Sequence, residues 1–364
     1  MNRKIISTIF ICAGLMCRAQ YSETYSFKPQ DLTKESEVVS LDELKEFPKH
    51  ILDWKKMRVL SIISEREFTE IPKDIDRLEN LEVFSMSGST GVTRFPNSFS
   101  RLNKLREITI HSIFIKEFPQ QIIKVKNLES LGFFCPFLEE YPSNLGDMKN
   151  LKTLNLACRT KDKVIVDGKN FIFKPLVIPK SIRNLKKLET LSVSQSLLQI
   201  LPDEIGDLQS LKRLDVSKNQ LKTLPESLSK LKNLVEITLD HNSFKEFPSA
   251  LYGIESLVKI NYNNNTIQNI PGGMEKMKNL KYFFASKSKI APSALVGLYN
   301  ASNLEVIDLS DCQIESLPPG IEKLSHLKAL FFWGNKISST EAENLRKKLP
   351  NTKIHLNSPA KRGF

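Results

Sequence analysis

The chain has 364 residues, enough for two ordinary globular domains, and 40% of them are hydrophobic. Its 53 Lys and Arg outnumber its 41 Asp and Glu, which gives a formal net charge of +12 at pH 7. After residue 19 no stretch resembles a membrane span, so a helical membrane anchor in the body of the chain is excluded.

Residues 1–19 have the pattern of a secretory signal peptide. Arg3 and Lys4 form the basic start, and the apolar run that follows is too short to anchor the chain stably in a bilayer. We therefore predict a secreted or periplasmic protein that begins at Gln20. A lipoprotein signal with Cys17 as the lipid-bearing residue is the less favoured alternative, because the bulky Met16 precedes that cysteine.

From about residue 40 onward, copies of one unit follow each other, and residues 211–233 (LKRLDVSKNQLKTLPESLSKLKN) are the clearest example. Leu214 and Val216 are two residues apart, as on one face of a strand, whereas Leu228 and Leu231 are three apart, as on a helical or 3₁₀ turn. A unit that combines these two periods cannot bury its own apolar face, so it must stack on copies of itself. Apolar residues stand at positions 1, 4, 6, 11, 14, 18 and 21 of this unit.

This pattern resembles the leucine-rich repeat family, especially the short class written LxxLxLxxNxLxxLPxxIxxLxx, over about residues 40–356. With its leader, the chain is similar to secreted members of bacterial type. The resemblance implies an α/β fold, a curved leucine-rich-repeat solenoid with a parallel sheet on the concave face and short helices or 3₁₀ turns on the convex face. Members of the family mostly bind proteins, and some bind glycans, lipids or nucleic acids. The repeat residues are framework, so the resemblance carries over no catalytic residue and no cofactor.

Four segments follow from the repeat. They are the signal peptide at 1–19, a lead-in and capping coil at 20–56, the repeats at 57–349, and a closing strand and tail at 350–364. Repeats begin at Met57, Leu81, Leu105, Leu128, Leu151, Leu188, Leu211, Leu234, Leu257, Leu280, Leu304 and Leu327.

The interval from Leu151 to Leu188 is 37 residues, so this coil carries an insertion near residues 160–175. Apolar runs on both sides of Asp167-Gly168 predict a β-hairpin there. Two interpretations stay open: a flap lying over the convex surface, and an edge strand that binds a partner.

Position 9 of each unit is predicted to turn the chain and to satisfy backbone groups that no strand reaches. Asn219, Asn242, Asn265 and Asn335 suit this role, and Ser196, Ser288 and Cys312 are weaker substitutes. Proline at position 15 lacks the N–H that a sheet needs, so it is predicted to start a turn on the convex side.

Removing residues 1–19 leaves a net charge of +9 and three cysteines, Cys135, Cys158 and Cys312. This odd number excludes a fully paired disulfide framework. Cys135 and Cys158 occupy position 8 of neighbouring units, so a disulfide between them is one interpretation. Two thiols are favoured, because in-register neighbours on parallel strands rarely have disulfide geometry.

Ligand-binding residues are expected at positions 3, 5, 7 and 8, whose side chains alternate outward from the leucines. Near the C-terminal end these positions hold a group of aromatic residues around one acid, which we take as the candidate binding site on the concave face: Tyr282, Phe284, Asp308, Phe331, Trp333 and His355. Exposed aromatic rings on a rigid sheet can anchor a protein loop or a sugar ring. The alternative is that these rings only cover the end of the solenoid.

Three other groups favour structural interpretations. The first group is His111, Phe114, Phe134 and Phe137, in which Phe134 is expected to face outward, whereas Phe114 and Phe137 are expected to pack under an irregular turn. Asp215, Glu236 and Asp240 are predicted to form a solvated acidic stripe, since no loop motif for a metal accompanies them. A rim of lysines is predicted near the start of the units, with an acidic ligand as the alternative to a role in solubility: Lys104, Lys126, Lys149, Lys186, Lys187, Lys230, Lys232, Lys276, Lys278, Lys281 and Lys328.

Catalytic and metal-binding patterns are missing from the sequence. The five histidines occur in different units, and there is no HExxH motif, phosphate-binding glycine loop or CxxC motif. We therefore predict an exported, non-enzymatic, monomeric binding protein with a protein partner. A cell-envelope or acidic-glycan ligand on the lysine rim is the alternative function, and binding of nucleic acid is not expected.

Overall fold

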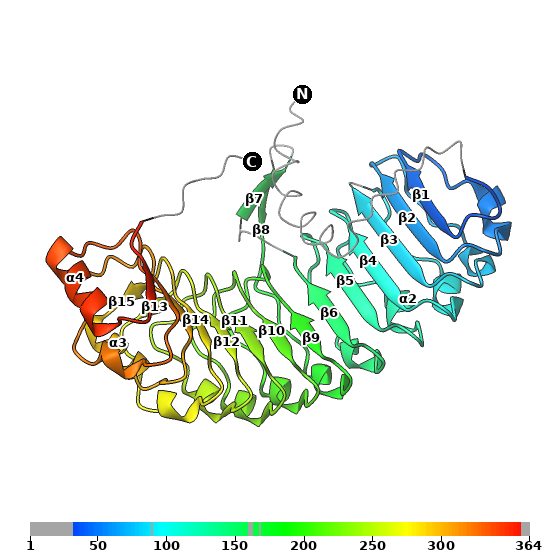
Figure 1. Cartoon of the computed structure of the whole chain (residues 1–364). Coiled ribbons are helices and arrows are strands. Elements are labelled where there is room, and N and C mark those ends of the chain that lie inside the picture. Colours follow the sequence, from blue (N-terminus) through cyan, green and yellow to red (C-terminus); the bar gives the residue numbers. More distant parts are fainter. Residues whose placement is uncertain (1–31, 89, 159–162, 167–168, 358–364) are drawn as a thin grey trace.

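The computed structural model describes residues 32–88, 90–158, 163–166 and 169–357, so the predicted signal peptide lies outside the described residues. In this part of the chain, stacked coils form an arc with strands on its inner side and short helical segments on its outer side (Figure 1). The predicted leucine-rich-repeat solenoid with a parallel sheet is confirmed.

One parallel sheet of 14 strands runs through the described coils. Its strands pair in this order: β1 (Val38–Asp42), β2 (Val59–Ser64), β3 (Val83–Gly88), β4 (Glu107–His111), β5 (Ser130–Phe134), β6 (Thr153–Leu156), β9 (Thr190–Ser192), β10 (Arg213–Asp215), β11 (Glu236–Thr238), β12 (Lys259–Asn261), β14 (Tyr282–Phe284), β16 (Val306–Asp308), β17 (Ala329–Phe331) and β18 (Lys353–His355). The register keeps position 4 in one column, since Leu214 pairs with Leu191 on one side and with Ile237 on the other. Side chains at the same repeat position are therefore neighbours on the sheet.

Short helical segments bring the chain back along the convex side. They are η2 (Lys49–Asp53), η3 (Ile75–Arg77), η4 (Asn97–Arg101), α2 (Gln120–Ile123), η5 (Leu145–Asp147), η6 (Lys180–Asn184), η7 (Asp203–Asp207), η8 (Glu226–Lys230), η9 (Ser249–Gly253), η10 (Met274–Lys276), α3 (Pro292–Leu298), η11 (Ile321–Lys323) and α4 (Ser339–Lys348). Pro202 and Pro225 stand at the N-caps of η7 and η8 with φ of −71° and −68°, the angle to which the pyrrolidine ring restricts them. The predicted role of proline at position 15 is confirmed at these caps.

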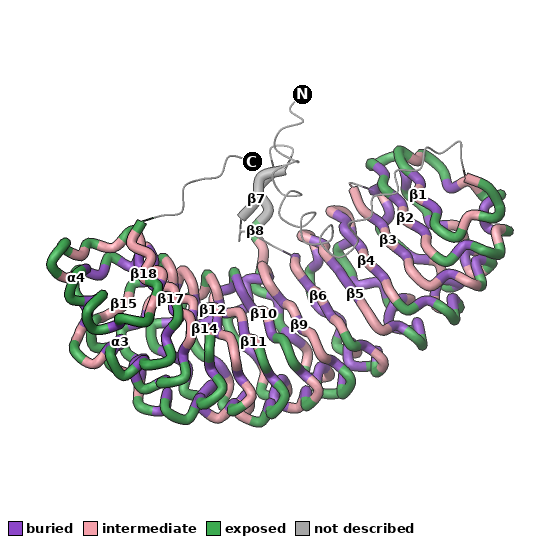
Figure 2. The backbone as a smooth tube through the Cα atoms, in the orientation of Figure 1, coloured by how far each residue is buried: buried purple, intermediate pink, exposed green. Residues whose placement is uncertain are grey.

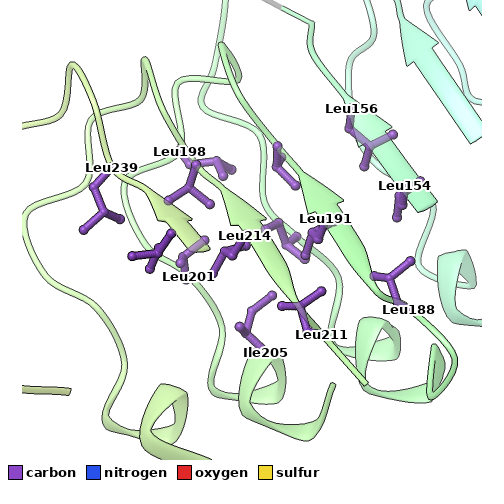
Figure 3. Packing of buried hydrophobic residues seen from close by; sticks show 14 of the residues in the cluster. Leu154, Leu156, Leu188, Leu191, Leu198, Leu201, Ile205, Leu211, Leu214 and Leu239 are labelled. Atoms are coloured by element: carbon purple, nitrogen blue, oxygen red, sulfur yellow. The ribbon is translucent and has the colours of Figure 1, made fainter. Parts of the chain in front are cut away.

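The core is a continuous stack of apolar side chains, many of them leucines, between the sheet and the convex segments (Figure 3). Leu211 and Leu214 are at most 1% exposed, and each contributes roughly 1.5–3 kcal/mol through burial. Buried and exposed residues alternate along every coil, so no coil has an interior of its own (Figure 2). The stability of each unit therefore depends on its neighbours.

Asparagines at position 9 form a ladder of hydrogen bonds, as predicted, and two of them, Asn219 and Asn265, are buried. The Asn219 side chain donates to the carbonyl oxygens of Val193 and Val216 at 2.7 and 3.0 Å. Its Oδ1 accepts from the backbone amides of Ser196 and Leu198, both at 3.0 Å. Asn242, Asn265 and Asn335 repeat this arrangement in other coils.

A second asparagine ladder was not predicted. The residue just before position 1 is often asparagine, and its side-chain amide donates to a backbone carbonyl of the preceding coil at 2.6–2.9 Å: Asn80, Asn127, Asn150, Asn233, Asn279 and Asn303. The recurring Asn-Leu dipeptide is the signal that sequence reasoning overlooked.

The turns after β9, β10, β11, β12, β14 and β16 differ from the expectation in one respect. The left-handed residue stands at position 8 rather than at position 9, with φ of 52–55° at Gln195, Lys218, His241, Asn264, Lys287 and Asp311. Position 9 supplies the hydrogen bonds, while position 8 supplies the change of direction.

The insertion forms the predicted β-hairpin, with β7 (Lys163–Val166) antiparallel to β8 (Lys169–Ile172). In Figure 1 it projects away from the coils on the side opposite the convex segments, so the interpretation as a flap over the convex surface is wrong. A ring contact of Phe137 with Phe173, at a centroid distance of 5.4 Å, lies at its base. A separate small parallel sheet joins two of the later coils. It consists of β13 (Thr266–Ile267) and β15 (Lys289–Ile290).

Cys135, Cys158 and Cys312 are buried thiols, so the favoured interpretation without a disulfide is confirmed. Burial raises the pKa of the Cys135 thiol well above its usual value. A protonated, buried thiol is a poor nucleophile, which fits a packing role for this residue.

Candidate functional site

The six predicted site residues lie on neighbouring coils at the C-terminal end of the concave face. Tyr282 and Phe284 lie on β14, Asp308 on β16, Phe331 on β17 with Trp333 two residues later, and His355 on β18. All six are half-buried, whereas the intervening position-4 residues such as Phe283 are fully buried. We call these six residues the C-terminal aromatic cluster.

Phe331 and His355 stack face to face across β17 and β18. Their ring centroids are 4.5 Å apart and their planes differ by 12°. This separation nearly equals the spacing of neighbouring strands, about 4.8 Å, so the ring planes stand across the sheet. The face of Phe331 that does not contact His355 is therefore directed toward β16.

A cation lies over one face of the Phe284 ring. The Lys259 Nζ lies over the Phe284 ring, 5.8 Å from its centroid, and forms an ion pair of 2.7 Å with Glu236. A cation above a ring face is attracted by the negative charge of that face. Lys259 was not predicted from the sequence, because its contact with Phe284 depends on pairing between residues of two different coils.

Asp308 lies between these two rings. The register pairs Asp308 with Phe284 on one side and with Phe331 on the other. Its Oδ1 accepts hydrogen bonds from the Ser310 backbone amide, at 2.9 Å, and from the Ser310 hydroxyl. Ser310, also missed from the sequence, fixes the orientation of the carboxylate.

The model of the leucine-rich repeat region matches residues 40–168 and 175–297, and a single leucine-rich repeat matches residues 303–324. The chain belongs to the leucine-rich repeat family. No curated protein matches the sequence of this leucine-rich repeat protein at a significant level.

Solved structures share the fold at low sequence identity. An internalin, InlF, from Listeria monocytogenes is 16% identical with a TM-score of 0.59, over 94% of this chain and 87% of its own. Drosophila Toll, solved in its complex with Spatzle, is 20% identical with a TM-score of 0.66, over 88% of this chain and 43% of its own. The ectodomain of the receptor kinase GASSHO1/SCHENGEN3 from Arabidopsis thaliana, in complex with CASPARIAN STRIP INTEGRITY FACTOR 2, is 20% identical with a TM-score of 0.52, over 88% of this chain and 40% of its own.

The second aromatic group of this leucine-rich repeat protein packs against itself. His111 is only 8% exposed and stacks on Phe134 at a centroid distance of 4.3 Å. Burial lowers the pKa of His111 to about 4, so the imidazole is neutral near pH 7. Arg66 lies 5.3 Å from the centroid of the Phe114 ring. These contacts support the structural interpretation.

The acidic stripe is held by internal hydrogen bonds. Asp215 accepts from Ser217 and Ser192, and Asp240 accepts from the Asn263 backbone amide at 3.2 Å. Burial raises the pKa of Asp240 above its usual value. Within the described residues, no group of three or more His, Cys, Asp or Glu side chains could hold a metal ion.

The lysine rim is tied to neighbouring coils. Lys281 and Lys328 both pair with Glu305, at 2.9 and 2.6 Å, and their hydrogen bonds hold the pKa of Glu305 at about 2. Lys187 donates to Asn150 at 2.8 Å. Lysines that are engaged in such contacts are less available to bind an acidic ligand. Among the residues described, no helix is long and apolar enough to cross a membrane.

Proposed function

We propose that this leucine-rich repeat protein is exported and binds a protein partner through its concave face, with the C-terminal aromatic cluster as the anchor. The observation that carries the proposal is the position of four half-buried aromatic rings at one end of a rigid sheet, with Tyr282 and Phe284 on β14, Phe331 on β17 and Trp333 just after β17. Aromatic side chains supply a large contact area and lose few rotamers on binding, so they are enriched among the residues that dominate binding energy.

The complexes of the fold neighbours support a protein ligand. Toll was solved with Spatzle and GASSHO1/SCHENGEN3 with CASPARIAN STRIP INTEGRITY FACTOR 2, and each shares the solenoid fold with this chain. We further propose that the chain is a monomer without catalytic activity. Its framework positions are filled by apolar residues and hydrogen-bonding asparagines, and its histidines occur in separate coils.

The lysine rim is a weaker basis for function than the aromatic cluster. Lys281, Lys328 and Lys187 already contact acidic or amide groups of neighbouring coils. If an acidic glycan nevertheless bound the rim, its affinity would fall steeply between low and moderate salt. Binding through the aromatic cluster is expected to change little over the same range.

The decisive experiment replaces Phe331 and Trp333 together by Ala. Purified mature protein, from Gln20 onward, is used to capture partners from envelope and culture fractions of the source cells. The double variant is expected to lose the captured protein while its melting temperature stays close to that of the wild type, because both side chains are half-buried. A matched control is Phe134→Ala, which removes a half-buried concave aromatic outside the cluster. Retention of the partner by the double variant would refute the site.

Export has a separate test. Expression of the full chain in a host with a secretory pathway, followed by N-terminal sequencing of the exported product, is expected to give Gln20 as the first residue. Lipid attached to Cys17 would identify the lipoprotein alternative instead. This measurement does not depend on the identity of the partner.

A further inference from the structure

We infer that the concave face holds a binding slot for one basic side chain, lysine or arginine, of the protein partner, with Phe284 and Phe331 as its walls and Asp308 as its floor. This inference deepens the proposed function and rests on it. It assigns a charge and a size to the group that the C-terminal aromatic cluster accepts.

The two walls present ring faces to each other. Phe331 has His355 against one face at 4.5 Å, so its other face is directed toward the Asp308 strand. Phe284 has the Lys259 Nζ over one face, 5.8 Å from the centroid, so its other face also borders the Asp308 strand. Ring faces carry the negative part of the aromatic quadrupole and therefore attract a cation.

The separation of the walls suits a cation. Phe284 and Phe331 lie two strand spacings apart, about 10 Å, so a cation above Asp308 would stand about 5 Å from each ring. Cation–π attraction acts within about 6 Å of a ring centroid. The chain already uses this geometry beside the slot, because Lys259 lies at a comparable distance from Phe284.

The floor carries an oriented acceptor. Ser310 holds Oδ1 of Asp308 through its backbone amide and its hydroxyl. In the described part of the chain, Oδ2 of Asp308 accepts no hydrogen bond from another residue. A lysine ammonium or an arginine guanidinium above the carboxylate would donate to this oxygen, which adds a charge-assisted hydrogen bond to the two ring contacts.

Three lysines on strands or coils next to the slot are paired with other acids. Lys281 and Lys328 are paired with Glu305, and Lys259 is paired with Glu236. Within the residues that the structure describes, Asp308 forms no ion pair with a lysine or arginine. A basic group of a partner would therefore meet an acid that no described residue neutralises.

Asp215 offers an internal comparison. It occupies the same repeat position on β10 and its Oδ1 accepts from the Ser217 amide at 2.9 Å, as Asp308 accepts from Ser310. Its Oδ2, however, accepts from Ser192 at 3.2 Å, and its neighbours in register are Ser192 and Thr238 rather than aromatic residues. Asp215 has the carboxylate without the walls, which makes it the matched control.

The test uses four capped tripeptide amides, Gly-X-Gly, in which X is arginine, lysine, citrulline or norleucine. Each is titrated at low salt into the mature protein, and the backbone amide signals of residues 284, 308 and 331 are followed by NMR. The arginine and lysine peptides are expected to cause saturable shifts. The uncharged peptides are expected to bind at least about tenfold more weakly, equivalent to about 1.4 kcal/mol.

Two variants then test whether binding of the basic peptides requires the carboxylate of Asp308. Asp308→Asn is expected to weaken the basic peptides about tenfold, while Asp215→Asn leaves their affinity unchanged. Equal binding of citrulline and arginine, an unaffected Asp308→Asn variant, or no saturable shift with any peptide would overturn the slot. If Asp308→Asn still captures the protein partner while the Phe331 and Trp333 double variant does not, the slot is wrong and the proposed function stands. If neither variant affects capture, the proposed function fails as well.

Discussion

The side-chain amide of Asn219 donates a hydrogen bond of 2.7 Å to the carbonyl oxygen of Val193, a residue of the preceding coil. The same side chain also donates to Val216 and accepts from two backbone amides, all within the buried interior. One asparagine thus satisfies polar backbone groups of two coils that no strand pairing reaches. The turn that follows β10 depends on this residue.

Replacing Asn219 by Ala is expected to lower the free energy of unfolding by about 3 kcal/mol, because it leaves several buried backbone groups without partners. Urea denaturation followed by circular dichroism measures this loss. Asn233→Ala is the matched control, since Asn233 is exposed and donates a single bond of 2.8 Å to the Gln209 carbonyl. It is expected to cost at most about 1 kcal/mol. Equal losses for the two variants would contradict the role assigned to the asparagine ladder at position 9.

Leu214→Ala is expected to cost about 2–5 kcal/mol through a cavity in the shared core. Leu214 is 1% exposed and its register neighbours Leu191 and Ile237 are fully buried, so little can move to fill the space. Leu214→Met keeps most of the volume and is expected to cost less than about 1.5 kcal/mol. Urea midpoints compare the two variants, and an alanine variant as stable as the methionine variant would show that the coil can collapse around the loss.

The spacing of apolar residues was sufficient to predict the solenoid, because the two periods of the repeat encode a strand and a helical turn directly. Leu214 and Val216, two residues apart, both face the core as that spacing requires. The asparagine at position 9 was equally readable, since its side chain alone combines donors and an acceptor of the right length. Where that position holds Ile113 or Pro136, the strands β4 and β5 extend to five residues instead of three.

The left-handed turn residue could not be read from the sequence. At position 8 it is Gln195, Lys218, His241, Asn264, Lys287 or Asp311, so no residue type marks it. The neighbouring coils impose this backbone angle, and the local sequence tolerates it.

The candidate site was predictable only in part. Alternation along each strand placed Phe284, Asp308 and Phe331 on the concave face, in one column that crosses three neighbouring strands. The stack of Phe331 on His355, and the cation of Lys259 over Phe284, depend on side-chain rotamers chosen among residues of different coils. Such choices follow from three-dimensional packing and leave no periodic signal.

Substitutions of Lys218 test whether the turn after β10 requires a left-handed backbone conformation. The φ of this lysine is 54°, a region that glycine enters without cost and that β-branched residues avoid. Lys218→Gly is expected to leave the urea midpoint unchanged or to raise it, whereas Lys218→Val is expected to cost about 1–2 kcal/mol. Lys222→Val, at an exposed position without a positive φ, controls for the change of side chain. If Lys218→Val costs no more stability than Lys222→Val, the coil can adopt another turn conformation.

His111 makes the stability of the N-terminal coils depend on pH. Burial lowers its pKa from the ordinary 6.5 to about 4. Between these values the unfolded chain binds a proton that the folded chain does not, so stability is complete above pH 6.5 and falls as the pH drops toward 4. Each pH unit in this window contributes up to about 1.4 kcal/mol, so the total loss is expected to approach about 3 kcal/mol.

Urea denaturation of the wild type and of His111→Gln at pH 7, 5.5 and 4.5 isolates this contribution, because all other titrating groups are common to both proteins. The wild type is expected to lose stability more steeply on acidification, and parallel profiles would mean that the imidazole becomes protonated without leaving its place beside Phe134.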